Sequence, residues 1–197
     1  MSLIRHLPLP LLLALGAGSA HADLLLGAQV GRQQLSVEER VNGSLVNDDD
    51  LRTRTALALV IGAGTPGADG ARVSLGGASH EFSGGGDLDL LTLGYQQMLP
   101  AFNPEAGYRL RPFFGVDLGF GRLARDAQPL FGRARDSGLT TGVTGGLNLA
   151  LGGKAELELG LRYSRLDLEV EQQGLGGAAT TRLRDNRAWW VGFNVGL

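Results

Sequence analysis

The chain has no cysteine in its 197 residues, so no disulfide stabilises it and its stability must come from other contacts. It also lacks a long apolar run. The longest one, residues 7–15, contains two prolines and falls well short of the roughly 20 residues of a transmembrane helix. Charge is nearly balanced, with 18 Lys and Arg against 20 Asp and Glu. This balance gives no reason to expect a nucleic-acid partner.

Catalytic and metal-binding signatures are missing as well. The sequence has no spacing typical of a nucleotide-binding loop, a dinucleotide fold, a zinc site or an EF-hand. Ser79, His80 and Glu81 include the residue types of a hydrolase triad, but neighbours in sequence seldom reach triad geometry. The acidic run 47–50 is typical of a solvated loop. We therefore expect no catalytic residue, no cofactor and no metal.

The N-terminus is typical of an exported protein. A positive charge at Arg5 precedes the short apolar run, and small residues follow it, ending at Ala20 and Ala22. This order matches a secretory signal peptide with an A-x-A cleavage site. We predict a cleaved signal peptide over residues 1–22 and a single mature domain, residues 23–197, that begins at Asp23.

The C-terminus carries the clearest structural pattern. Large apolar residues alternate with Gly, Asn and a second tryptophan, and they are Trp189, Val191, Phe193, Val195 and Leu197. This period of two predicts a β-strand that runs to the last residue. A bare strand edge recruits other chains, whereas a closed barrel in a membrane removes the edge and surrounds the apolar face with lipid.

Similar alternation recurs through the glycine-rich chain. It predicts eight strands at about 24–31, 53–61, 71–78, 88–99, 108–122, 139–151, 155–166 and 187–197. Long polar connections at 36–52, 79–87, 123–138 and 167–186 alternate with short turns at 63–70, 100–107 and 152–154. We predict an all-β fold, an eight-stranded antiparallel up-and-down transmembrane β-barrel with its long loops outside the cell.

The dipeptide Asn42-Gly43 predicts a tight hairpin turn between the first two strands. A two-residue turn there fixes a register in which paired residue numbers add up to 85. Leu24 then pairs with Ile61, so the apolar faces of the two strands coincide. The hairpin tip should project into solvent.

Residue size indicates which face looks inward, because a narrow eight-stranded interior admits only small side chains. The polar face is rich in small residues, so the large apolar face should meet lipid. Aromatic side chains then fall into two belts at the membrane interfaces, formed by Tyr95, Tyr108 and Phe193 at the inner ends and by Phe120, Tyr163 and Trp189 at the outer ends.

Charged residues on the inward face predict a network inside the barrel. They are Arg54, Arg72, Arg109, Arg111, Asp117, Glu156, Glu158 and Arg162. Charges in a narrow interior must be paired, and we expect Glu156 and Glu158 to meet Arg72, Arg109 or Arg111, and Asp117 to meet Arg162. We interpret the network as a structural plug; a gated ion path is the alternative.

The signal peptide, the strand 112–121 and the closing strand 189–197 together resemble the small outer-membrane β-barrel superfamily, which includes the OmpA transmembrane domain, OmpX and the opacity-type proteins. The resemblance implies insertion by the barrel-assembly machinery, which reads an alternating apolar C-terminal strand with a terminal aromatic residue. Trp189, Val191, Phe193 and Val195 match that signal, and Leu197 departs from it.

We therefore expect a monomer in the outer membrane of a Gram-negative bacterium, in contact with lipid and lipopolysaccharide. Its activity should lie in the outer loops, as a structural or surface-interaction role that includes adhesion to a host or surface ligand. A narrow passive channel is the alternative, and a lipid A-modifying enzyme is the third hypothesis.

Overall fold

The computed structural model describes residues 23–64, 69–81, 85–102, 109–152 and 154–197, with the side chains of 48–54 left out. The predicted signal peptide, with Ala20 and Ala22, and Tyr108 lie outside the described residues. No helix in these described ranges is long and apolar enough to cross a membrane.

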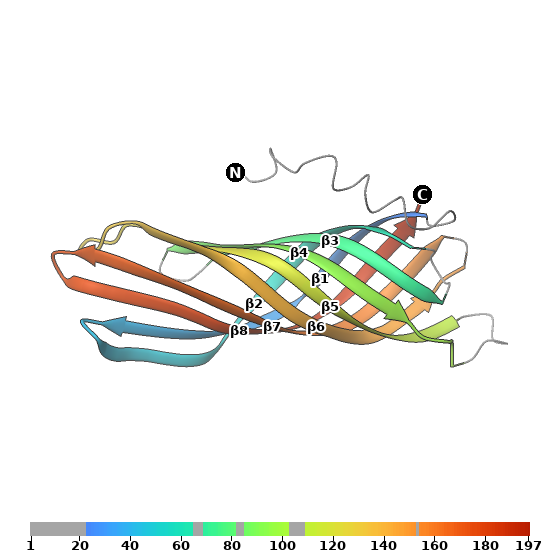
Figure 1. Cartoon of the computed structure of the whole chain (residues 1–197), viewed down its shortest axis with the longest axis horizontal. Coiled ribbons are helices and arrows are strands. Elements are labelled where there is room, and N and C mark those ends of the chain that lie inside the picture. The colour runs from blue at the N-terminus through green and yellow to red at the C-terminus, as the bar shows by residue number, and fades with distance from the viewer. Residues whose placement is uncertain (1–22, 65–68, 82–84, 103–108, 153) are drawn as a thin grey trace.

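Eight strands form one closed antiparallel barrel in chain order (Figure 1). They are β1 (Leu24–Val41), β2 (Ser44–Ala63), β3 (Gly70–Glu81), β4 (Gly86–Met98), β5 (Arg109–Arg125), β6 (Ala134–Ala150), β7 (Ala155–Gly174) and β8 (Gly177–Gly196). β8 pairs with β1 and closes the ring, so the C-terminal strand has no free edge. The predicted all-β, eight-stranded, up-and-down topology is confirmed.

The register of the first hairpin differs from the prediction. Next to the turn, Val41 pairs with Ser44 as the Asn42-Gly43 dipeptide requires. Two irregularities farther down the hairpin then shift the pairing, so that Ile61 lies opposite Leu26 and the predicted pair with Leu24 is wrong. A bulge adds an unpaired residue that no turn motif reveals. The net shift is two residues, so the apolar faces still coincide.

Strand length is the larger correction. β7 and β8 continue to Gly174 and from Gly177, so most of the predicted loop 167–186 is a β-hairpin. The predicted loops 36–52, 123–138 and 79–87 are likewise shortened by extended strands. Figure 1 shows the β1–β2, β5–β6 and β7–β8 hairpins reaching far beyond the β3–β4 hairpin, at the end opposite the C-terminus.

A belt of exposed apolar side chains surrounds the half of the barrel nearer the C-terminus. We define this apolar belt by Leu24, Leu26, Val30, Leu57, Leu59, Ile61, Leu91, Leu93, Tyr95, Phe114, Val116, Leu118, Phe120, Leu139, Val143, Leu147, Leu157, Leu159, Leu161, Tyr163, Trp189, Val191 and Phe193. Leu57 and Leu161 are each about two-thirds exposed. A water-facing surface rarely carries an apolar patch this large, so the belt favours lipid as its surroundings.

Beyond the belt the two faces exchange character. On β7, Leu159 and Tyr163 point outward within the belt, whereas farther along Glu169 and Glu171 occupy the same outward face. The inward face changes in the opposite sense, from Glu158 to a run of buried apolar side chains. The strand therefore keeps its alternation of exposed and buried side chains through a β-bulge between Arg165 and Leu168, and reverses its polarity there.

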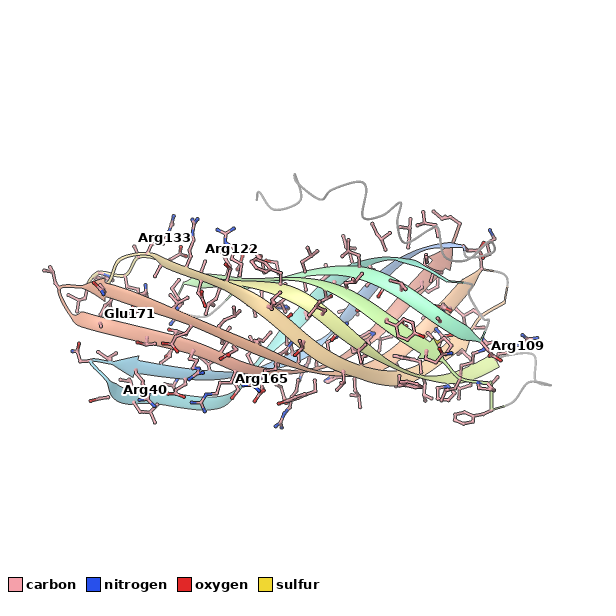
Figure 2. The ribbon with its side chains drawn as sticks, viewed as in Figure 1. Arg40, Arg109, Arg122, Arg133, Arg165 and Glu171 are labelled. Carbon is pink, nitrogen blue, oxygen red and sulfur yellow. The ribbon has the colours of Figure 1, made fainter. Side chains whose placement is uncertain are left out.

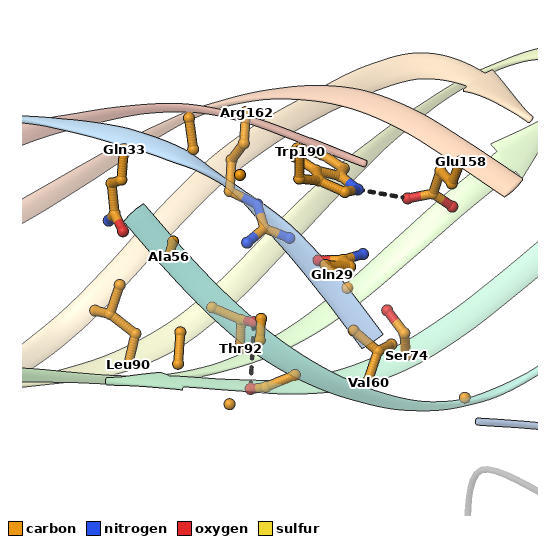
Figure 3. A pocket seen from close by; sticks show the side chains of 18 of the residues that line it. Gln29, Gln33, Ala56, Val60, Ser74, Leu90, Thr92, Glu158, Arg162 and Trp190 are labelled. Carbon is orange, nitrogen blue, oxygen red and sulfur yellow. Dashed lines mark hydrogen bonds between the residues drawn. The ribbon is translucent and has the colours of Figure 1, made fainter. Parts of the chain in front are cut away.

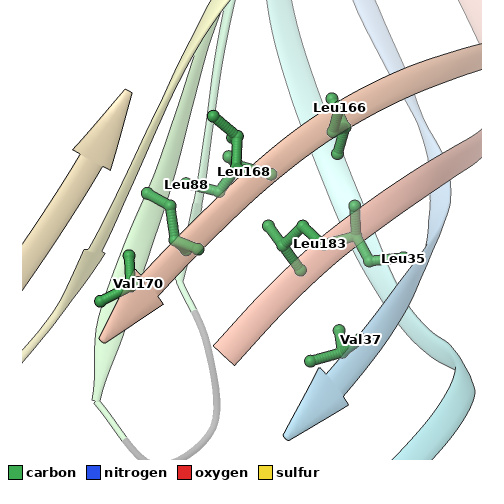
Figure 4. Packing of buried hydrophobic residues seen from close by; sticks show 8 residues of the cluster. Leu35, Val37, Leu88, Leu166, Leu168, Val170 and Leu183 are labelled. Atoms are coloured by element: carbon green, nitrogen blue, oxygen red, sulfur yellow. The ribbon is translucent and has the colours of Figure 1, made fainter. Parts of the chain in front are cut away.

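The inward apolar side chains beyond the belt form a core, shown in Figure 4. This upper core consists of Leu35, Val37, Leu88, Leu123, Leu166, Leu168, Val170 and Leu183, from β1, β4, β5, β7 and β8. Each is at most 2% exposed. The prediction that the inner face is small and polar is therefore wrong for this end of the barrel. The outward side chains of β7 around it are polar, among them Glu169 and Glu171, which suits a sheet in water with its apolar face inside.

Candidate functional site

Three charged residues form the centre of the lumen network. The guanidinium of Arg72 donates to both carboxylate oxygens of Glu156, at 2.5 and 2.9 Å, and lies 3.8 Å from Glu158. All three side chains are at most 5% exposed. A bidentate arginine–carboxylate pair is the geometry that best offsets the cost of burying both charges.

Trp190 completes this centre. Its indole nitrogen donates to Glu158 at 2.9 Å, and Asn194 donates to Glu156 at 3.1 Å. The guanidinium of Arg162 lies 5.3 Å from the centre of the Trp190 ring, within the range of a cation–π contact. Figure 3 shows Arg162, Trp190 and Glu158 side by side along the lumen.

A second ion pair, between Arg162 on β7 and Asp117 on β5, lies beside this centre. Arg162 Nε is 2.7 Å from a carboxylate oxygen of Asp117, which is buried. Gly142 on β6, between β5 and β7, provides the space for this ion pair, because a Cβ there would lie 2.1 Å from the Asp117 carboxylate. The two residues thus meet as the sequence pairing proposed.

The remaining predicted charges separate. Arg111 is buried and donates to Asp69 at 2.9 Å, so it does not reach the glutamates. Arg109 is exposed at the end of β5, as Figure 2 shows, and its placement in the lumen is wrong. β5 begins at Arg109, so the barrel wall does not surround this residue. A side chain that alternates with the outward-facing residues is therefore not enclosed at this position. The side chain of Arg54 lies outside the described residues.

The lumen cavity is small. Its volume is about 80 Å³, and it is lined by side chains that include Gln29, Gln33, Thr92, Arg162 and Trp190 (Figure 3). Pockets for small-molecule ligands usually measure about 300–1,000 Å³. The upper core lies at one end of this space and the Arg72–Glu156 pair at the other.

The residues Ser79, His80 and Glu81 do not form a triad. They lie on β3, where successive side chains alternate between faces. His80 is buried and lines the cavity, whereas Ser79 is exposed and donates to Asp89 at 2.7 Å. The expected loop at 79–81 is therefore wrong, and the hydroxyl and imidazole point in opposite directions.

Sequence reasoning missed Trp190, Asn194 and the upper core as parts of the interior. For Trp190 the signal was available, since it alternates with the outward Trp189. For the upper core, the alternation of Leu166, Leu168 and Val170 with acidic residues was also visible. This segment has the opposite polarity to the belt, so the rule that apolar residues face outward predicts a polar loop there.

The extended hairpins are joined to one another above the belt. β1 and β8 stay paired as far as Val41 and Ala179. At the tip, Asn42 and Ala178 exchange hydrogen bonds, and the side-chain amide of Asn42 donates to the Gly176 carbonyl. We call the parts of β1–β2, β5–β6 and β7–β8 beyond the belt the hairpin platform.

The β5–β6 connection is fastened to the same tip. The Gln172 amide donates to the carbonyls of Asp126 and Gly132, and the Gly132 amide donates to Gln173. Leu130 and Leu175 remain exposed there, with Leu175 97% exposed. The tip thus offers apolar side chains on a hydrogen-bonded frame.

Charged side chains also link the platform. Glu38 accepts from Arg40 at 2.5 Å and contacts Arg184 across the β1–β8 pair. The hydrogen bond from Arg40, with the nearby charges of Arg184 and Arg182, lowers the pKa of Glu38 below its ordinary value of 4.5, against a smaller opposing effect of burial.

The predicted interface aromatics that the structure describes, Tyr95, Phe120, Tyr163, Trp189 and Phe193, are all 44–47% exposed and point outward. On the closing strand, Val191, Phe193 and Leu197 are exposed and Val195 is half-buried. Asp23 precedes β1 and lies 4.0 Å from Lys154.

Solved structures of other barrels are similar to the chain over most of its length. The outer membrane protein OprG from Pseudomonas aeruginosa is 16% identical, with a TM-score of 0.58 over 90% of this chain and 97% of that one. Neisserial surface protein A is 14% identical, with a TM-score of 0.57 over 90% and 99%. The fold of the present chain is that of the small eight-stranded outer-membrane β-barrels.

A third member of this fold, the outer membrane protein AlkL solved in DMPC lipid bilayers, is 20% identical, with a TM-score of 0.56 and coverage of 92% of both chains. No protein-family model and no curated protein sequence matches the chain. The small outer-membrane barrel fold predicted from the resemblance is confirmed.

Proposed function

We propose that the protein is exported by residues 1–22, cleaved before Asp23 and inserted into a Gram-negative outer membrane as a monomer. The apolar belt supports lipid as its surroundings, with the belt aromatics at the two interfaces. The alternating apolar residues Trp189 to Val195 support recognition of the closing strand by the barrel-assembly machinery.

Within that membrane, the lumen charges act as a structural plug. Arg72 and Glu156 span from β3 to β7 across the interior, and Trp190 fills the adjacent space. The upper core closes the lumen beyond them. Such an interior supports a non-enzymatic barrel that passes no substrate.

The function carried best by this geometry is surface interaction, including adhesion, through the hairpin platform. The upper core is the single observation that carries it, because buried leucines turn what would be mobile loops into a folded sheet outside the membrane. Exposed Leu130 and Leu175 at the joined tips suit contact with a partner at the cell surface.

Adhesion of expressing cells to epithelial cells and to matrix-coated surfaces tests this function. We expect the protein to raise adhesion and a variant with Leu130→Ser and Leu175→Ser to lose most of the gain. Equal adhesion with and without the protein would argue against the proposal.

Two further measurements address orientation and the alternatives. Since the chain lacks cysteine, Leu175→Cys should react with an impermeant maleimide on intact cells, and Leu151→Cys only after permeabilisation. Steady conductance in a planar bilayer would favour a channel, and a lipid A profile altered by the gene would favour an enzyme.

A further inference from the structure

The outward face of four strands changes from apolar to arginine at the edge of the belt. On each strand the first outward side chain beyond the belt is an arginine: Val30 is followed by Arg32, Phe120 by Arg122, Tyr163 by Arg165, and Trp189 by Arg187. Beyond the same edge, β3 and β4 carry Ser79 and Asp89 instead. Arg122 on β5 is separated from the other three strands by β6, whereas β7, β8 and β1 are neighbours in the ring.

Three of these arginines lie on adjacent strands. Arg32 is opposite Trp189, and Tyr163 is opposite Arg187. Arg187 on β8 is thus the diagonal neighbour of Arg32 on β1 and of Arg165 on β7. Diagonal neighbours on one face are about 7–8 Å apart, within reach of long side chains. We call Arg32, Arg165 and Arg187 the outer arginine cluster.

The cluster has little compensating charge. All three side chains are exposed, and no ion pair joins any of them to another side chain that the structure describes. Asp185 lies opposite Arg165, and its carboxylate, which accepts a hydrogen bond from the Tyr163 hydroxyl at 2.7 Å, offsets part of the charge and leaves the cluster with a net positive charge. Like charges side by side on a sheet are unfavourable unless an anion lies between them.

We infer that the outer arginine cluster binds the phosphoryl groups of an outer-leaflet glycolipid of the lipid A type. Guanidinium groups bind phosphate in a bidentate manner. Val30, Tyr163 and Trp189 lie directly below the cluster on the belt, where acyl chains of the same lipid would run. A free phosphate would gain nothing from these apolar neighbours, so the position favours a lipid. The inference rests on the proposed outer-membrane location.

The far ends of the same strands differ. On β1, β7 and β8 the outward residues there include Leu24, Leu157 and Phe193, and the basic residue at that end, Lys154, lies 4.0 Å from the carboxylate of Asp23. The cluster therefore belongs to the leaflet on the platform side. In an outer membrane oriented with the platform outside, that leaflet is the one that holds phosphorylated glycolipid.

Binding of purified bisphosphoryl lipid A to the refolded protein in detergent micelles tests this site, with lipid adducts counted by native mass spectrometry. The variant combines Arg32→Ala, Arg165→Ala and Arg187→Ala. Arg109→Ala, an exposed arginine at the opposite end, is the matched control (Figure 2). We expect the triple variant to bind at least about tenfold more weakly, since each basic residue near an anionic surface contributes measurably, and the control to bind as the wild type does.

Monophosphoryl lipid A should bind more weakly than the bisphosphoryl form, and a triple lysine variant should retain part of the affinity. Undiminished binding by the alanine variant, an equal loss in Arg109→Ala, or equally tight binding of inorganic pyrophosphate would overturn the inference. The heat-dependent gel shift reports folding of every variant; if the triple variant fails to fold, the three single substitutions replace it. Labelling of Leu175→Cys on intact cells tests the membrane location independently of lipid binding, so a failure of the location can be distinguished from a failure of the lipid site.

Discussion

The Trp190 indole donates a hydrogen bond to the Glu158 carboxylate across the β7–β8 pair, 2.9 Å away inside the lumen. The tryptophan thus satisfies one oxygen of a buried carboxylate and fills the space beside it. Directly opposite Trp190 lies Gly160, where any side chain would collide with the ring. The packing of Trp190 against Gly160 and its hydrogen bond to Glu158 therefore depend on the same position of the indole ring.

The Gly160–Trp190 contact predicts a steric effect of one methyl group. A Cβ at Gly160 would lie 2.1 Å from the indole ring, so Gly160→Ala should displace the ring and cost about 1–3 kcal/mol of unfolding free energy. Urea unfolding in lipid vesicles, followed by Trp190 fluorescence in a Trp189→Phe background, measures it. Gly77→Ala is the control, because nothing lies within 4 Å of that Cβ position. Equal effects at the two glycines would contradict the packing.

The Arg72–Glu156 pair predicts a strong penalty for removing one partner. Glu156→Leu leaves the Arg72 charge buried without its main partner, which typically costs about 3–5 kcal/mol. Arg72→Met combined with Glu156→Leu should recover much of that loss. A double-mutant cycle of unfolding free energies checks this, and additive losses would show that the two residues are not coupled.

The belt predicts a dependence on height along β7. Leu159 is half exposed in the middle of the belt, so Leu159→Arg should destabilise the inserted barrel by about 2–4 kcal/mol. Glu171 points outward on the same strand but beyond the belt, so Glu171→Arg should change stability by less than about 0.5 kcal/mol. Unfolding in vesicles compares them, and similar losses would place both residues in the same surroundings.

The platform should loosen in acid. Because the pKa of Glu38 is lowered in the folded state, its ionised form contributes stability above its ordinary value of 4.5, and that contribution is lost as pH falls through the lowered pKa. The protection factors of amides in the β1–β8 part of the platform, corrected for the intrinsic exchange rate at each pH, should therefore fall as the pH drops below the ordinary value of 4.5. Glu38→Gln should already exchange faster at neutral pH and show a smaller acid response. An identical acid response would assign it to other groups.

The strand count, topology and belt were predictable because one period-two pattern governs all eight strands. The pairing of Asp117 with Arg162 followed from parity and height. For Glu156 the same reasoning left Arg72, Arg109 and Arg111 open, and the structure pairs it with Arg72. The register of Leu26 with Ile61 was not predictable, since bulges depend on local packing. Arg109 shows that parity predicts burial only where the wall continues on both sides.

The platform was missed for a different reason. The residues Leu166, Leu168 and Val170 alternate with Asp and Glu as clearly as the belt residues do, but with the opposite face apolar. A barrel that leaves lipid for water must make this exchange, because the solvent outside the wall changes while the alternation of exposed and buried side chains along β7 continues. A single rule for which face points inward therefore failed beyond Arg165.

That exchange of polarity along β7 is the central claim, and a spin-label scan of single cysteines at residues 157–171 tests it most directly, since the chain has no native cysteine. The predicted result is that odd positions to 163 are accessible to oxygen dissolved in lipid, that odd positions from 165 are accessible to a water-soluble relaxation agent, and that even positions are accessible to neither. Access of the water-soluble agent to positions 166, 168 and 170 would contradict the account.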